Sequence, residues 1–274
     1  MNRKEIKSQA WGLMKTGNPK PLYVTIVYVV ILIAFSFLSF KLVGEGISGF
    51  FNSFSVQVNL NDPTAAPDDK VVEQFLLGLE EAIPGPLPQL LNTALKLLSM
   101  VIGAGFIIFL LRIISGEGAA FGNLFDGFSM FFRIVWLYIL EGIFIFLWGL
   151  LFIVPGFIAF YRYRMAIYLR LERPELTAMQ CIDESKRLMS GYKAELFVLD
   201  LSFIVWYLAI GVLNSVSTKI GIIILGTSIL GYVVQCWLLP YKGLSCALFY
   251  KKRIELDNSD NAGFFDEPAD FPEF

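Results

Sequence analysis

Long apolar runs separated by short polar segments dominate this chain of 274 residues. Five of the runs approach the roughly 20 residues that cross a hydrocarbon core of about 30 Å, and a sixth, shorter run follows the third of them. Runs of this length and composition predict an all-α, polytopic transmembrane helical bundle with about six spans. The predicted spans are residues 22–40, 90–111, 134–154, 156–170, 196–213 and 220–240.

The third and fourth predicted spans meet inside the stretch WGLLFIVPGFIAFYRYRMAIYL, which begins at Trp148. Proline cannot continue a helix but suits the first turn of the next one, and glycine tolerates a tight turn. We therefore expect a hairpin that turns at Pro155 and Gly156. Its returning arm has only about 14 residues, so a re-entrant pair or a tilted, partly interfacial helix is an alternative to a full span.

Three further segments place apolar residues on one helical face, which is typical of amphipathic helices at an interface. The first face holds Ile6, Ala10, Leu13 and Met14. The second lies within residues 72–83. The third follows a capping box from Thr177 to Gln180 and ends before Gly191. Its apolar face holds Ala178, Ile182, Ser185 and Met189.

Lysine and arginine are unevenly distributed between the connecting segments. Sixteen of the 22 lie in one alternating set of segments, and three lie in the other set, which includes the loop 41–89. The segments rich in basic residues are 1–21, 112–133, 170–194 and 241–253. By the positive-inside rule, these segments and both termini lie in the cytoplasm of a bacterial plasma membrane.

Basic side chains on this cytoplasmic side predict contact with anionic lipid headgroups. The residues in question are Arg3, Lys4, Lys7, Lys186 and Arg187. The apolar run that follows the first three is longer than that of a cleaved leader, so we expect the N-terminal segment to be retained.

Charged residues inside the predicted spans need partners, because an unpaired charge in hydrocarbon is costly. Glu141 lies 14 residues before Pro155 and Arg170 lies 15 after it, which predicts that they face each other. Trp148 and Arg162 are each seven residues from Pro155, a spacing that allows a cation–π contact. Such pairs could staple the hairpin, or Arg170 could extend to the headgroups. Alternatively, Glu141 could bind a proton or a cationic substrate.

Asp200 and Gln235 form a second predicted pair. Both lie near the cytoplasmic ends of their spans, and at equal depth they could form a hydrogen bond between helices. The alternative is that each caps the end of its own helix.

Composition supports the membrane assignment and argues against an enzyme. Hydrophobic residues make up 56% of the chain and charged residues 17%, against roughly 25% charged in an ordinary soluble domain. The sequence has no histidine, and Cys181, Cys236 and Cys246 form no CxxC motif. It also has no Walker loop or dinucleotide fingerprint. We therefore expect no catalytic residues, no metal and no other cofactor.

The last residues differ from the rest of the chain. Residues 254–274 contain seven acidic residues and no basic ones, together with four phenylalanines. Such a segment cannot build a core, so we expect a disordered cytoplasmic tail that could dock a protein partner. Residues 1–253 then form the integral membrane domain.

Three stretches carry a resemblance to a known family. They are the stretch from Trp148 to Leu169 quoted above, ERPELTAMQCIDESKRLMSGYKAELFVLDLSFIVWYL, and LLPYKGLSCALFY. Together with the opening RKEIKSQA, they resemble an uncharacterised family of multi-pass membrane proteins of Gram-positive bacteria, catalogued as a domain of unknown function. The resemblance implies location and topology, but it supplies no activity and no catalytic residues.

These observations leave two classes of function. The first is a non-enzymatic accessory, scaffolding or protective membrane component, of an immunity or stress type, that acts by binding lipids or a protein partner. The second is a component of a small-molecule or peptide transporter with Glu141 in its pathway. We expect no nucleic-acid partner for either class, and the sequence leaves the oligomeric state open.

Overall fold

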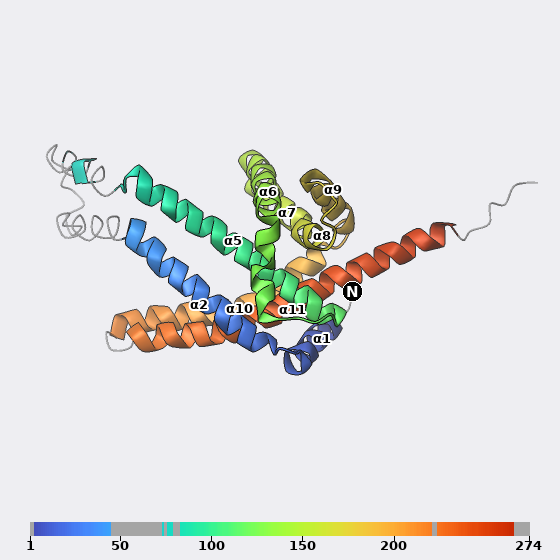
Figure 1. Ribbon diagram of the computed structural model, residues 1–274, viewed down its shortest axis with the longest axis horizontal. Helices are drawn as coiled ribbons and strands as arrows, with labels where there is room; N and C mark the ends of the chain where they lie inside the picture. The colour runs from blue at the N-terminus through green and yellow to red at the C-terminus, as the bar shows by residue number, and fades with distance from the viewer. Residues whose placement is uncertain (1–2, 45–72, 74–75, 79–82, 221–223, 266–274) are drawn as a thin grey trace, which may run out of the picture. The chain divides into compact units, whose positions relative to one another are not determined.

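The computed structural model describes residues 3–44, 73, 76–78, 83–220 and 224–265 (Figure 1). Throughout these ranges the chain forms helices joined by turns, without a strand, so the all-α prediction is confirmed for the described part. The helices belong to two units. One consists of Met1–Val29 and Val101–Phe274, and the other consists of Val30–Met100.

Three helices among the described residues are long and apolar enough to cross a membrane. They are Pro21–Gly44 (α2, Pro21–Ser39, with the π-helical η1, Phe40–Gly44), Pro86–Ser115 (α5), and Phe121–Leu151 (the 3-10 helix η2, Phe121–Met130, with α6, Phe131–Leu151). They overlap the first three predicted spans. Their length and composition suggest a membrane protein.

The unit Val30–Met100 holds the end of α2, η1 and the start of α5. Within it, the hydroxyl of Ser39 donates a hydrogen bond to the side-chain oxygen of Asn92 at 2.6 Å, which joins the two helices. Most of the predicted loop 44–89, and most of the amphipathic helix expected at 72–83, lie outside the described residues.

The first amphipathic helix is α1, Arg3–Thr16. Its buried residues are Ile6, Ala10 and Met14, three of the four predicted for its apolar face. This face packs against α11 (Ile224–Phe265), where the ring centroids of Trp11 and Trp237 lie 5.4 Å apart. Protein therefore covers the apolar face of α1, and its polar side stays exposed.

Helix α6 ends at Leu151, and α7 runs from Ile153 to Tyr163. Phe152 between them is extended, so the helix breaks three residues before Pro155. Pro155 and Gly156 lie in the first turn of α7, where proline is tolerated. A Cβ added at Gly156 would lie 2.7 Å from the Cα of Gly149, so the two backbones touch. We call these two packed helices the α6–α7 pair.

The third amphipathic segment is α9, Ala178–Leu188, which follows the short α8, Ala166–Glu172. Thr177 caps α9 as predicted. Its hydroxyl accepts from the Gln180 backbone N–H at 3.3 Å, and its own N–H donates to the Gln180 side chain at 2.8 Å. Gly191 has a φ of +80°, a conformation that suits glycine at the end of a helix.

Helices α10 (Lys193–Ile220) and α11 pack side by side (Figure 1). Helix α11 continues to Phe265, so the first part of the segment predicted to be disordered, residues 254–265, is helical. An ion pair 2.7 Å long between Arg187 on α9 and Asp257 on α11 holds this extension beside α9. Residues 266–274 lie outside the described residues.

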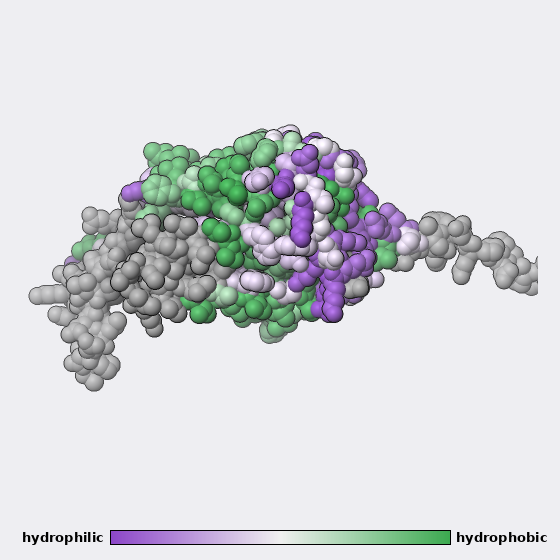
Figure 2. Space-filling model, turned by 90° about the horizontal axis from the view of Figure 1, so that it is seen from below, coloured by the Kyte–Doolittle hydropathy of each residue, from purple (hydrophilic) through white to green (hydrophobic). Residues whose placement is uncertain are grey.

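The core of the larger unit is built from the faces where these helices meet. Its largest fully buried side chains include Ile6, Phe109, Phe203, Phe249 and Tyr250, which come from α1, α5, α10 and α11. Outside the core, many large apolar side chains are exposed. Figure 2 shows many hydrophobic residues at the surface, as expected of a protein in contact with lipid.

Two glycines allow η2 to lie directly on α5. A Cβ at Gly105 would overlap the backbone carbonyl of Leu124, and a Cβ at Gly127 would lie 2.5 Å from the carbonyl oxygen of Val101. Any side chain at either position would force the two backbones apart. Close helix contact through glycine is common in membrane proteins.

We predict that Gly105→Ala destabilises the protein by about 1–3 kcal/mol, because the added methyl group meets backbone atoms that cannot rotate away. Thermal unfolding in detergent measures the effect. The matched control is Gly142→Ala in α6, where a Cβ meets nothing within 4 Å. A Gly105→Ala variant as stable as the Gly142→Ala variant would contradict the prediction.

Candidate functional site

A cluster of charged side chains joins α7, α10 and α11 around Asp200. The guanidinium of Arg164, just after α7, donates to both carboxylate oxygens of Asp200, at 2.6 and 3.4 Å. The hydroxyl of Tyr161 donates to the same carboxylate at 3.2 Å. From α11, the ammonium of Lys242 lies 3.6 Å from Asp200. We call these four residues the Asp200 cluster.

The Asp200 cluster is shielded from solvent and carries more positive than negative charge. The side chains of Asp200 and Arg164 are only 11% and 21% exposed. One carboxylate faces two cations, so Asp200 is the residue on which the other two charges depend. The arrangement holds three helices together, and it contains no nucleophile paired with a base.

The prediction that Asp200 pairs with Gln235 is wrong as to the partner, because Arg164, Tyr161 and Lys242 occupy its carboxylate. Lys242 follows Gln235 by seven residues, two helical turns along the same face of α11. Asp200 of α10 therefore lies beside Lys242, at a position two helical turns beyond Gln235 along α11. An isolated acid in an apolar helix signals a basic partner, and Arg164 was one of the few bases inside a predicted span.

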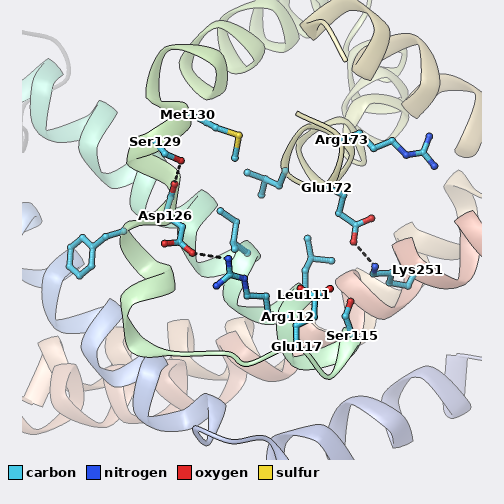
Figure 3. Close-up of a pocket in the computed structure, with 13 residues that line it drawn as sticks. Leu111, Arg112, Ser115, Glu117, Asp126, Ser129, Met130, Glu172, Arg173 and Lys251 are labelled. Carbon is cyan, nitrogen blue, oxygen red and sulfur yellow. Dashed lines mark hydrogen bonds and ion pairs between the residues drawn. The ribbon is translucent and has the colours of Figure 1, made fainter. Parts of the chain in front are cut away.

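A pocket of about 710 Å³ lies where α5, η2, α8 and α11 approach one another. Figure 3 shows an ion pair on each of two sides of the pocket. Arg112 of α5 lies 3.3 Å from Asp126 of η2, and Lys251 of α11 lies 2.5 Å from Glu172 of α8. Because both pairs neutralise themselves, the walls offer polar contacts but little net charge. Among the described residues, no group of three potential metal ligands is present here or elsewhere.

A second pocket, of about 520 Å³, is basic. Arg3, Lys4 and Lys7 of α1 line one side, and the start of α10, including Ser202, lines the other. The ammonium of Lys7 lies 4.6 Å from the ring centroid of Phe203. Burial, together with the charge of Arg3, lowers the pKa of Lys7. We call this the basic pocket.

No acidic residue lines the basic pocket within the described part of the chain. The one acid of α1, Glu5, is held 3.0 Å from Lys252 of α11 instead. The structure therefore places Arg3, Lys4 and Lys7, the three predicted lipid-binding residues of α1, around a single cavity.

The other two predicted lipid-binding residues are neutralised within the protein. Lys186 lies 2.6 Å from Asp183, and Arg187 pairs with both Glu184 and Asp257. Hydrogen bonding from Arg187 holds the pKa of Glu184 below its usual value. Lys186 and Arg187 of α9 therefore offer an anionic lipid much less uncompensated positive charge than the sequence suggested.

The predicted pair of Glu141 and Arg170 does not form, although the structure describes both residues. Arg170 is buried and donates to the carbonyl of Leu176. One carboxylate oxygen of Glu141 is buried without a hydrogen-bond partner in the described part of the chain. The prediction assumed one continuous returning helix, but the chain leaves α7 at Arg164 and begins α8 at Ala166. Counting residues therefore does not give the depth of Arg170.

The structure describes both Trp148 and Arg162, and the predicted cation–π contact between them does not form. Because the break lies at Phe152, Trp148 is four residues before it and Arg162 is ten after it. At 1.5 Å per residue this separates their levels by about 9 Å. Trp148 is instead exposed.

We predict an order of stability for three variants of the Asp200 cluster. Asp200→Asn leaves two partly buried cations without a counter-charge, which costs on the order of 3–5 kcal/mol. Arg164→Gln leaves Asp200 with Lys242 as its one cation and with the hydrogen bond from Tyr161, and it should cost less. Lys242→Gln keeps the bidentate pair and should cost less than about 1 kcal/mol. Thermal unfolding in detergent gives the order, and a Lys242→Gln variant as unstable as Asp200→Asn would refute it.

Comparison with known protein families gives a match to part of the chain. No curated protein and no solved structure matches the chain. The match covers residues 150–256, which include α7 to α10, most of α11 and the whole Asp200 cluster. Over these residues the chain is similar to a protein family described as "Protein of unknown function (DUF975)".

Proposed function

We propose that this protein is a non-enzymatic, multi-pass component of a bacterial plasma membrane that binds anionic lipid at its cytoplasmic face. In this role it acts as an accessory, scaffolding or protective (immunity- or stress-type) protein. The basic pocket is the observation that carries the proposal. From the family resemblance we also propose that the protein comes from a Gram-positive bacterium.

The distribution of basic residues supports the proposed orientation. With both termini in the cytoplasm, the basic pocket lies on the side where the leaflet carries anionic lipid. Helix α1 leads directly into α2, which is apolar enough to cross the membrane. This connection supports a position of the pocket near the membrane surface. Six spans, including a hairpin at the α6–α7 pair, are the topology that the sequence favours.

The shape of the basic pocket supports a lipid as its occupant. Three cationic side chains attract a phosphate, and the apolar side chains Val198, Leu199 and Leu201 form the opposite wall. A phospholipid presents the same combination of a charged headgroup beside acyl chains. The absence of histidine from the sequence supports a binding role over catalysis.

A protein partner is a further element of the proposal. The acidic C-terminal segment carries no basic residue, and α11 extends its helix as far as Phe265. An acidic helix that projects from a membrane protein can present a docking surface to a basic partner.

We predict that the triple variant Arg3→Gln, Lys4→Gln, Lys7→Gln loses affinity for phosphatidylglycerol on the order of 100-fold at low salt, since each basic residue contributes about 1 kcal/mol. Titration of the detergent-solubilised protein with short-chain phosphatidylglycerol measures this affinity. Short-chain phosphatidylcholine should bind weakly, and added salt should release phosphatidylglycerol.

The matched control replaces three basic residues that do not line the pocket, Lys15, Lys20 and Lys193, with glutamine. The control removes the same net charge and should retain the affinity of the wild type. Equal binding of phosphatidylcholine, or equal losses in the two triple variants, would reject the proposal.

A transporter component is the second candidate, and Glu141 is the observation that favours it. A partly buried carboxylate without a described partner, in a helix apolar enough to cross a membrane, is a recurring feature of proton and cation pathways. In this reading a small molecule or peptide crosses beside α6.

Our leading proposal predicts no proton flux. Proteoliposomes with the protein and a pH-sensitive dye inside should dissipate an imposed pH gradient no faster than empty liposomes. The Glu141→Gln variant should behave like the wild type. Faster dissipation that Glu141→Gln abolishes, and that Glu175→Gln leaves intact, would favour the transporter instead.

A further inference from the structure

The end of the α6–α7 pair is apolar and uncovered on every side. All nine consecutive residues from 146 to 154 are exposed, including Phe152, Ile153 and Val154 at 68%, 88% and 67%. A helix on the surface of a protein bundle exposes one face, whereas here the last residues of α6 are exposed on every face, and α7 is covered at its start only where Gly156 touches Gly149. No Asp, Glu, Lys or Arg occurs between residues 142 and 161. Such a tip is stable only when acyl chains surround it.

The charged helix α9 fixes where this apolar tip begins. The ammonium of Lys186 lies 5.9 Å from the ring centroids of both Phe144 of α6 and Tyr163 of α7. The hydroxyl of Ser185 donates to the carbonyl of Arg162 at 2.9 Å and accepts from the N–H of Met165 at 3.2 Å. A helix with an amphipathic, charged outer face is thus docked on both arms, and the aqueous boundary lies at its level.

The tip beyond this boundary is too short to cross a bilayer. From Phe144 to Leu151 the chain rises about 10 Å, and from Ile153 to Tyr163 about 15 Å. The hydrocarbon core is about 30 Å thick, so the tip reaches only to its middle. The full helix Phe121–Leu151 is long enough to span. However, its first part, η2, lines the polar pocket through Asp126 and Ser129.

We propose that the α6–α7 pair is re-entrant: it enters the bilayer from the cytoplasmic side and turns back within the hydrocarbon, with Phe152–Val154 among acyl chains. This rests on the proposed orientation with cytoplasmic termini. Helices α2, α5, α10 and α11 are then the four full spans. The distribution of lysine and arginine fits this arrangement as well as six spans, because residues 112–133 and 170–194 stay in the cytoplasm in both.

Single cysteines test the placement in a full-length background in which Cys181, Cys236 and Cys246 are replaced by serine. Ile153→Cys reports the tip, Gln89→Cys the outer side, and Asp183→Cys the cytoplasmic side. A membrane-impermeant maleimide is applied to intact cells and to inverted vesicles. We expect Ile153→Cys to be labelled from neither side and to react only after denaturation. A fluorophore attached there should be quenched most strongly by mid-chain spin-labelled lipid.

Each alternative gives a different result. Labelling of Ile153→Cys from outside, at the rate of Gln89→Cys, means that the pair spans the bilayer and overturns the proposal. Labelling from inside, at the rate of Asp183→Cys, means that the tip lies in water and also overturns it. The proposed orientation is tested separately by Gln89→Cys. Labelling of Gln89→Cys from the inside would show that the orientation is wrong. If Ile153→Cys does not accumulate, Val154→Cys gives the same reading.

Discussion

The hydroxyl of Ser185 lies at the break between α7 and α8, where the chain that follows the α6–α7 pair changes direction. It bonds the carbonyl of Arg162 and the N–H of Met165, backbone groups on either side of the break between α7 and α8. Backbone groups buried at a helix break need such partners. The break turns α8 so that Glu172 meets Lys251 on α11, and it places Arg164 beside Asp200. The two hydrogen bonds of Ser185 thus hold the point from which α7 and α8 reach their partners on α10 and α11.

Several charges of the larger unit are paired inside the protein. Asp200 holds two cations, and the two sides of the 710 Å³ pocket each pair an acid with a base. Arg187 is likewise shared between Glu184 and Asp257. The basic pocket gathers three cations opposite apolar residues of α10.

Features that depend on nearby residues were predictable from the sequence, and features that depend on the level of one helix against another were not. The buried face of α1 and the Thr177 cap follow from spacings of three and four residues. The partners of Asp200 depend on the break after α7 and on the register of α11, which no local pattern encodes. The helix beyond residue 254 depends on Arg187, which is 70 residues from its partner Asp257.

The contact of Gly149 with Gly156 gives the α6–α7 pair a narrow cross-section, since no side chain separates the two backbones. A body that occupies one leaflet adds area to that leaflet alone, and the unequal areas favour bending of the bilayer towards the other side. The protein as we place it would therefore concentrate where the membrane is already curved, and its distribution in a cell would follow membrane shape as well as lipid charge.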